Sequence, residues 1–504
     1  MTAEMITFVL YFAALFGVAL VFYFNGSNKN QEDFFLGGRS VGPWVAALSA
    51  QASDMSAWLL MGLPGSILAF GFGQIWIGIG LAIGTAANWI ICAKRLRIFS
   101  ESADDAITIP QYLANRFATD SKTLQFICAL IFLFAYTVYV ASAFVAGTTV
   151  FEQLFPGVST SVIMIIFALV IVAYTFLGGF KAVCWTDFFQ GLLMMLALMA
   201  VPIIVLLTQN PDPAALAAVY EYTDASGAVV TCSFGSGIFS ASWQEVITGL
   251  GWGLGYFGMP HIIVRFMSIT KPSQVKTSSI VAIVWVVISL GAACLVAYYG
   301  RMLVAEELLP YGLQKTVFIV MARKYFPTAI SGLLLAAIIA AAISTADSQL
   351  LVASSSFTSD LYVPLFRKNA SEKEILLVGR LVVFVLAFIA YLLASSRGSG
   401  AQAIMNMVEN AWGAFGSAFG PTIILSLFWR KFNYKGAVAG VLVGFIVDVV
   451  WMITLTGSTG VYEIVPGFIC SMIAAVVVTM ATGGANEKET GVFDKAVEAG
   501  QHAE

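Results

Sequence analysis

Two short strings interrupt stretches of the chain that are otherwise almost wholly apolar. ASDMSAW (52–58) lies inside the apolar segment 43–70, and GWGLGYFGMP (251–260), with four glycines and a proline, lies inside 244–268. Unwound backbone at membrane depth survives only where it lines a cavity or is buried in protein. Glycine-mediated helix packing explains one such string. Two at matching positions favour a binding site, because the ends of broken helices offer free N–H and C=O groups to ions and solutes.

Carboxylates inside apolar segments are a second source of chemistry. Asp54 belongs to the first interrupted string, Asp187 lies near the start of a later segment, and Asp347 follows a Ser-Thr pair. An ionisable side chain within a membrane is costly and is by default a functional hypothesis. For Asp187, capping of a helix that begins near Lys181 is an equally good explanation.

Catalytic and tightly bound metal centres are hard to build from this sequence. Only His261 and His502 are available, and the six cysteines are scattered singly without a CxxC pair, so neither a histidine-based nor a cysteine-based centre is expected. No nucleophile and base are recognisable as a pair. The sequence therefore predicts a protein that is not an enzyme and carries no organic cofactor.

The elements that must position these residues are membrane spans. Of 504 residues, 59% are hydrophobic and 11% are charged, whereas a soluble domain carries about 25% charged residues. The apolar blocks are about 20 residues or longer, enough to cross a bilayer. Thirteen are predicted, all helical and forming one transmembrane domain over 1–483: 5–24, 43–70, 73–92, 122–153, 159–177, 185–208, 244–268, 276–300, 327–361, 375–395, 403–428, 434–455 and 462–483.

The distribution of positive charge predicts the orientation of the chain. With thirteen spans, 20 of the 25 Lys and Arg residues fall on one side, Lys29 and Arg39 among them, and five fall on the other: Arg301, Lys315, Arg323, Lys324 and Arg397. Basic loops stay in the cytoplasm, so the N-terminus is expected outside and the C-terminus inside. The polar tail 484–504 is expected to be a disordered cytoplasmic segment.

Five strings resemble the sodium/solute symporter family, and most of all its sodium/proline members. They are LGGRSVGPWVAALSAQASDMSAWLLMGLPG (36–65), YTFLGGFKAVCWTDFFQ (174–190), GWGLGYFGMPHIIVRFM (251–267), AAIIAAAISTADSQLLVASSSFTSDLY (336–362) and WGAFGSAFGP (412–421). The resemblance implies a leucine-transporter-like fold with a 5+5 inverted repeat, one extra N-terminal helix and two extra C-terminal helices. Repeat one would cover about 43–208 and repeat two about 244–428. The interrupted segments, second and seventh of thirteen, agree with this spacing.

The resemblance also implies a sodium site between the first helix of repeat one and the third helix of repeat two. Its ligands would be the carbonyl oxygens of Ala52, Met55 and Ala341 and the hydroxyls of Ser344 and Thr345. Sodium is a hard cation that several such oxygens satisfy. Packing of Ser and Thr against helices is the plainer role of a lone hydroxyl pair. The resemblance further implies an additional ion path near Asp54, Asp187, Asp347 and Ser348.

For the solute, the resemblance implies L-proline. Broken-helix ends suit its charged groups, and aromatic walls suit its ring. Most aromatic residues of such a chain belong to the core or to the interfacial belt, but a Trp-Tyr pair inside a broken segment is less easily explained that way. The residues implied are Ser56, Ala57, Trp58, Gly62, Tyr139, Trp252, Tyr256 and Pro260.

Five further residues have open interpretations. Ala57 stands where proline members commonly have glycine and Met259 where they have glutamine, which leaves other small solutes open as substrates. Arg39 is either part of an internal gate or a charge that sets topology. Glu409 opens the eleventh segment and would face water, while Asp448 has no physical account.

The mechanism expected is alternating access in a multi-pass cell membrane, the bacterial inner membrane by resemblance, with the bilayer, sodium and the solute as partners. No nucleic acid and no obligatory protein partner are expected. Alternatives from other classes are a solute sensor, a channel and a proton-driven carrier. The tail after Thr482 is too short for a signalling domain, so a sensor would need a separate partner chain.

Overall fold

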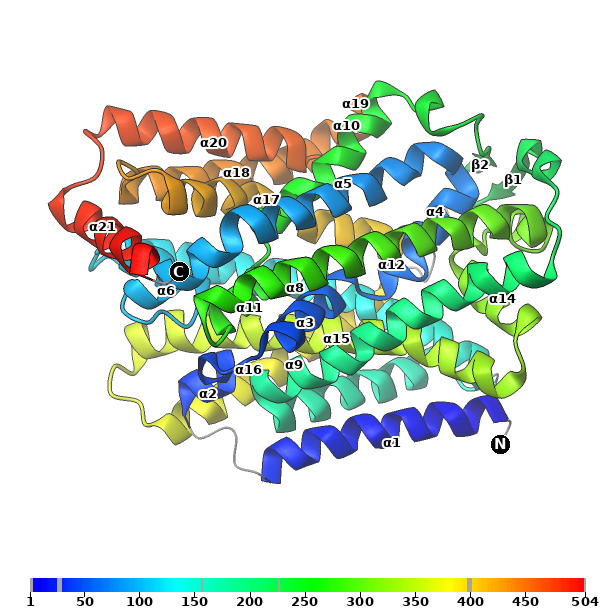
Figure 1. Ribbon diagram of the computed structural model, residues 1–504, viewed down its shortest axis with the longest axis horizontal. Helices are drawn as coiled ribbons and strands as arrows, with labels where there is room; N and C mark the ends of the chain where they lie inside the picture. The colour runs from blue at the N-terminus through cyan, green and yellow to red at the C-terminus, as the bar shows by residue number, and fades with distance from the viewer. Residues whose placement is uncertain (1–2, 25–29, 156, 225–226, 397–400, 503–504) are drawn as a thin grey trace.

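Long helices lie side by side along the long axis of the molecule, as the computed structural model shows (Figure 1). The structure describes residues 3–24, 30–155, 157–224, 227–396 and 401–502. Lys29 and Arg397, which enter the charge count, lie outside these residues. The N-terminus and the C-terminus are at opposite ends of the bundle (Figure 1).

The helices and strands are as follows in chain order. They are α1 (Ala3–Phe24), α2 (Gln31–Leu36), α3 (Pro43–Met55), α4 (Gly62–Phe70), α5 (Ile75–Ala87), α6 (Lys94–Ser102), α7 (Ile109–Arg116), α8 (Thr123–Leu154), α9 (Thr160–Thr208), β1 (Tyr220–Thr223), β2 (Val229–Cys232), α10 (Trp243–Trp252), α11 (Pro260–Ser268), α12 (Val275–Leu303), α13 (Ala305–Leu308), α14 (Val317–Tyr325), α15 (Thr328–Ser356), α16 (Glu372–Ser396), α17 (Ala401–Phe428), α18 (Tyr434–Thr454), α19 (Thr456–Thr459), α20 (Ile464–Ala481) and α21 (Glu487–His502).

The all-helical membrane architecture agrees with the prediction. Within the described part of the chain, ten helical stretches are long and apolar enough to cross a membrane, and Thr160–Phe176 is a shorter apolar helix. The predicted segments 159–177 and 185–208 are joined in α9, where Gly179 at φ 64° breaks the helical path. The predicted segments 43–70 and 244–268 are each divided in two, as α3–α4 and α10–α11.

Helix α15 lies in the core of the bundle. It packs against α9, α8, α1 and α3, and every side chain from Leu335 to Gln349 is buried. A helix that is buried on all sides needs small residues so that its neighbours can approach closely, and the run AAIIAAAIS supplies them. The same burial places the Ser344–Thr345 pair and Asp347 deep inside the protein.

The prediction of a disordered tail is wrong for Glu487–His502, which form α21. Asn486 and Glu489 make a reciprocal capping box, with bonds of 3.0 and 2.7 Å between the side chain of each and the backbone N–H of the other. Such a box stabilises a helix start. Phe493 and Ala496 then bury one face, so a segment that is polar on average still folds.

The antiparallel hairpin β1–β2 is a second feature that an all-α class omits.

Candidate functional site

Helix α3 ends abruptly inside the bundle. After Met55, Ser56 takes φ 48° and ψ −176°, and a 3-10 turn over Ala57–Leu59 leads to α4. The Ser56 hydroxyl accepts a bond of 3.1 Å from the Trp58 N–H and so caps the turn. A positive φ is uncommon for a serine and stores strain that the surroundings must hold. The break leaves the last carbonyls of α3 available to partners from other helices.

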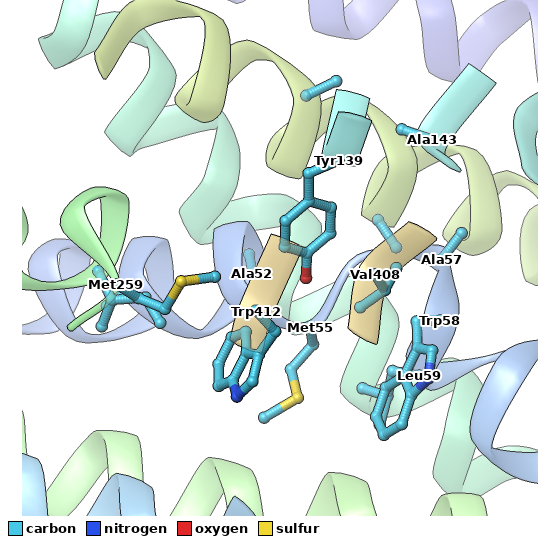
Figure 2. Packing of buried hydrophobic residues seen from close by; sticks show 14 of the residues in the cluster. Ala52, Met55, Ala57, Trp58, Leu59, Tyr139, Ala143, Met259, Val408 and Trp412 are labelled. Atoms are coloured by element: carbon cyan, nitrogen blue, oxygen red, sulfur yellow. The ribbon is translucent and has the colours of Figure 1, made fainter. Parts of the chain in front are cut away.

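The hydroxyl pair of α15 meets this helix end. Ser344 Oγ donates to the Ala52 carbonyl at 2.8 Å and to the Ala341 carbonyl at 3.2 Å. Thr345 Oγ1 approaches the Ala52 carbonyl at 3.5 Å. Four of the five predicted sodium-binding residues therefore converge on one point. Met55, the fifth, closes α3, and its buried side chain lies near Trp412 (Figure 2).

The second broken helix needs its glycines for close packing. Between α10 and α11 a 3-10 segment covers Gly253–Phe257. A Cβ at Gly255 would lie 2.0 Å from Trp412 Nε1, and one at Gly258 would lie 2.4 Å from the Phe415 carbonyl oxygen. No larger residue fits at either place without moving α17. These glycines therefore serve helix packing as well as the break itself.

An aromatic cluster joins the two breaks. The rings of Trp58 and Trp252 stack with centroids 5.4 Å apart and planes at 24°. Tyr256 meets Trp412 edge to face at 5.1 Å, and Trp252 lies 5.2 Å from Tyr462. All five side chains are buried. Trp412 and Tyr462 are absent from the predicted pocket, because nothing local to their sequence links them to the breaks.

Tyr139 reaches the same place from α8. Its ring stands between Met259 and Ala57 in Figure 2, and its hydroxyl donates to the Asp54 carbonyl at 3.4 Å. Met259 is completely buried. Of the two positions at which the sequence departs from the sodium/proline pattern, Ala57 is itself a predicted pocket residue and Met259 directly precedes another, Pro260.

Asp54 connects the two broken helices directly. The Tyr256 hydroxyl donates to Asp54 Oδ2 at 2.6 Å, and Asp54 is 3% exposed. A short bond to a buried carboxylate is a strong interaction. The residue predicted for the ion path therefore contacts a residue predicted for the solute pocket.

The remaining predicted pocket residues lie beside the breaks. A Cβ at Gly62 would lie 2.6 Å from the Trp58 ring, so only glycine lets this ring lie on α4. Pro260 is the first residue of α11, where its missing N–H costs nothing. Both positions shape the backbone around the aromatic cluster.

Asp187 and Ser348 lie around a buried arginine that the sequence analysis does not single out. Arg265 Nη2 lies 3.1 Å from Asp187 Oδ2 and 2.5 Å from Ser348 Oγ. Ser49 bridges the pair, donating to Asp187 at 2.7 Å and accepting from Arg265 Nε at 2.9 Å. Asp187 therefore pairs with a charge inside the bundle and does not cap a helix start. A buried ion pair needs this kind of additional hydrogen bonding.

Asp347 is different from Asp187. It is completely buried, and neither of its carboxylate oxygens has a hydrogen-bond partner among the residues that the structure describes. Buried polar atoms are nearly always paired. The free oxygens mark a position where a cation or a proton can be accommodated.

Arg39 fastens several segments at the end of the bundle that carries the C-terminus. It contacts Asp105 Oδ1 at 2.7 Å, the Met267 carbonyl at 2.7 Å and the Ala106 carbonyl at 2.9 Å. The loop before α3 is thereby tied to the end of α11 and to the loop before α7. The structure thus gives Arg39 an acidic partner, Asp105, and both interpretations of Arg39 stay predictions.

Glu409 and Asp448 lie on α17 and α18, and Glu409 contacts Tyr462 of the aromatic cluster. Asp448 is buried and accepts from Ser417 Oγ at 2.9 Å. Glu409 is half-buried, and its backbone carbonyl accepts from the Tyr462 hydroxyl at 2.7 Å. Asp448 therefore has a hydrogen-bond partner on α17 that the sequence does not reveal.

Comparison with known proteins gives a consistent picture. A family model described as the sodium:solute symporter family matches residues 34–444. The osmoregulated proline transporter OpuE of Bacillus subtilis (strain 168) is 41% identical over 474 residues, 94% of each chain. The sodium/proline symporter of Haemophilus influenzae is 39% identical over 99% of this chain and 99% of its own length. The sodium/proline symporter of Escherichia coli (strain K12) is also 39% identical, over 95% of this chain and 93% of its own length.

Two solved structures share the fold. A substrate-bound, outward-open sodium-coupled sialic acid symporter superposes with a TM-score of 0.74, at 21% identity over 96% of this chain and 99% of that one. The nucleobase-cation symporter Mhp1, closed with a hydantoin bound, gives 0.54 at 14% identity, over 92% and 98%. At these identities the likeness concerns the fold alone.

Proposed function

Since the chain belongs to the sodium:solute symporter family, we propose that it carries L-proline into the cell together with sodium by alternating access. The observation that carries this proposal is the meeting of Ser344, Thr345 and the Ala52 carbonyl at the end of α3. That point lies on the same broken helix as Asp54, which contacts the aromatic cluster through Tyr256. We choose L-proline as the substrate because the relatives compared above are named proline transporters.

Sodium would bind where oxygens of α3 and α15 converge. The carbonyls of Ala52, Met55 and Ala341 and the hydroxyls of Ser344 and Thr345 are its proposed ligands. All five residues are buried, so the ion would exchange its water shell for neutral protein oxygens. Ser344 donates its proton to the Ala52 carbonyl. A bound ion would replace the Ser344 hydroxyl as the partner of that carbonyl, and the hydroxyl oxygen would turn a lone pair towards the ion.

L-proline would bind between the two breaks. The backbone of Ser56, Ala57 and Gly62, and the start of α11 at Pro260, would meet its carboxylate and amine. Trp58, Tyr139, Trp252 and Tyr256 would enclose its ring. Each of these four aromatic side chains is at most 3% exposed. Entry therefore requires a movement of the broken helices, as alternating access demands.

The proposed topology has thirteen spans in a 5+5 inverted repeat. One of the ten long stretches, Ala57–Ser102, contains both α4 and α5–α6. If α4 is joined to α3 as one broken span and α5–α6 is counted as the next, then Thr160–Phe176 and α10–α11 bring the total to thirteen. Repeats over about 43–208 and 244–428, with one helix before and two after, form a single domain over 1–483. The charge distribution puts the N-terminus outside and α21 in the cytoplasm, in a bacterial inner membrane.

Asp187, Asp347 and Ser348 form the proposed exit path or second cation site. Asp347, whose carboxylate oxygens have no hydrogen-bond partner in the described part of the chain, lies on α15. Asp187, which is paired with Arg265, lies on α9, and α9 packs against α15. Another small solute, an amino acid or an organic acid, remains the second candidate for the cargo. It is favoured by Ala57 and Met259, both buried near Tyr139.

Uptake of radiolabelled L-proline into proteoliposomes tests the proposal. We expect accumulation with an inward sodium gradient, none with a pH gradient alone, and strong loss in Ser344→Ala/Thr345→Ala. The control is Ser331→Ala, which removes another buried hydroxyl of α15, one that donates to Glu4. Sodium-driven uptake of another solute in place of proline would overturn the substrate and keep the ion site.

A further inference from the structure

A groove of about 530 Å³ opens between α6 and the C-terminal half of α21. The two helices lie beside each other at the end of the bundle that carries the C-terminus (Figure 1). Lys94 and Arg95 line the groove from α6, and Val497 and Gly500 line it from α21. No acidic side chain is among its lining residues in the described part of the chain. The transport proposal uses no part of this groove.

The two cations are presented differently. Arg95 is held in place: its Nε donates to the Leu427 carbonyl at 2.6 Å, and its guanidinium lies 4.8 Å from the Phe428 ring. The Lys94 ammonium has neither a hydrogen bond nor an ion pair with any side chain or carbonyl that the structure describes. A fixed guanidinium and a free ammonium side by side suit a phosphodiester, which accepts several charge-assisted hydrogen bonds.

The groove continues onto a membrane-facing surface. Ile90 and Ile91, at its edge, are 69% and 49% exposed. They belong to the π-helical turn Asn88–Ala93 inside a stretch apolar enough to span the bilayer. Exposed isoleucines on such a stretch contact acyl chains. The positive side chains and the apolar surface are therefore adjacent, as the headgroup and the acyl chains of a phospholipid require.

Two nearby acids of α21 are used elsewhere. Asp494 forms a two-bond ion pair with Arg430 at 2.7 Å for each bond, and the Glu489 carboxylate accepts from the N–H groups of Tyr434 and Asn486. Glu498, a further acid of α21, is exposed and is not one of the residues that line the groove. The charged side chains that line the groove are therefore both positive, Lys94 and Arg95. An anion is the occupant that complements them.

We propose that the groove between α6 and α21 binds an anionic phospholipid, with its phosphodiester on Lys94 and Arg95 and an acyl chain along Ile90 and Ile91. The acyl chain distinguishes this occupant from a free phosphate. Anionic lipids are enriched in the cytoplasmic leaflet, on which side the charge distribution places these residues. The lipid would also pin α21 against the membrane domain.

Titration of the purified full chain in nonionic detergent, read by native mass spectrometry, tests the site with phosphatidylglycerol and phosphatidylcholine. Two cations near a headgroup predict an affinity for phosphatidylglycerol about 30-fold higher than for phosphatidylcholine. Lys94→Gln should weaken phosphatidylglycerol binding about fivefold. Val497→Glu, which puts a negative charge in the groove, should weaken it further. Lys495→Gln on the exposed face of α21 is the control and should change nothing.

Three outcomes would overturn the proposal. Equal binding of both lipids would show an apolar groove alone. A loss in the control variant Lys495→Gln equal to that in Lys94→Gln would show a general effect of surface charge. Displacement of phosphatidylglycerol by millimolar inorganic phosphate would show a free anion site. Thermal unfolding without lipid checks that each variant is folded, and Lys94→Met replaces Lys94→Gln if that variant is not.

Discussion

The bond between Tyr256 and Asp54 gives the sharpest test of how solute and ion are coupled. Tyr256→Phe removes only the hydroxyl that donates to Asp54 Oδ2 at 2.6 Å and keeps the ring against Trp412. Leaving a buried acceptor without its donor costs about 1–3 kcal/mol. Asp54 is buried, so little water can replace the lost donor. We expect the apparent affinity for sodium to fall about 5- to 150-fold.

The assay is equilibrium binding of radiolabelled L-proline to purified protein over a range of sodium concentrations. Because coupling is reciprocal, the variant should show both a higher sodium requirement and a smaller effect of sodium on proline affinity. Tyr434→Phe, which loses a hydroxyl contact with Ser121 of 2.9 Å at the start of α18, is the matched control. An unchanged sodium requirement in Tyr256→Phe would refute the role of this bond.

Three further predictions concern packing and charge. Gly255→Ala should unfold at a markedly lower temperature and bind proline poorly, because its Cβ would lie 2.0 Å from Trp412 Nε1. Gly491→Ala on α21, where nothing lies within 4 Å of the added Cβ, should change neither the unfolding temperature nor proline binding. Arg265→Met should lower the free energy of unfolding by about 3–5 kcal/mol, because it leaves Asp187 buried without its partner. Adding Asp187→Asn to the same chain should restore part of the thermal stability. If the double variant is less stable than Arg265→Met alone, loss of the ion pair is not the cause. Arg430→Gln, in an exposed ion pair of a kind that contributes little to stability, should leave the midpoint of chemical denaturation almost unchanged.

The interrupted helices are predictable because their causes are local. The strings at 52–58 and 251–260 concentrate glycine, proline and serine, which weaken a helix, and the breaks fall there in the structure. The convergence of Ser344 on Ala52 is expected only through the family resemblance. No local property of either residue specifies a partner 292 positions away.

Other parts of the site escape prediction for the same reason. Arg265 is counted only as one of the 20 positive charges on the cytoplasmic side, yet it is buried and paired with Asp187. Trp412 belongs to a family-like string but receives no role from it, although its Nε1 donates to the Trp252 carbonyl at 2.8 Å. Each contact depends on how α9, α11 and α17 are arranged, which a single sequence does not determine.

The error over the tail has a different origin. Average polarity suggests disorder, but Asn486 followed three residues later by Glu489 is a readable capping signal. Phe493 and Ala496 are spaced to share one helix face. Weighing these local signals above composition would have predicted α21.

Coupling between ion and solute follows from the strain at the end of α3. Ser56 is held at φ 48°, and a backbone conformation of this kind costs of order 1–3 kcal/mol. An ion on the Ala52 carbonyl would hold the helix end on one side of Ser56, and a solute on Trp58 would hold the turn on the other. Whichever ligand binds first offsets the cost of ordering the same few residues, so the second binds more tightly. The expected coupling energy is therefore of the size of that local cost, about 1–3 kcal/mol, without any longer pathway through the protein.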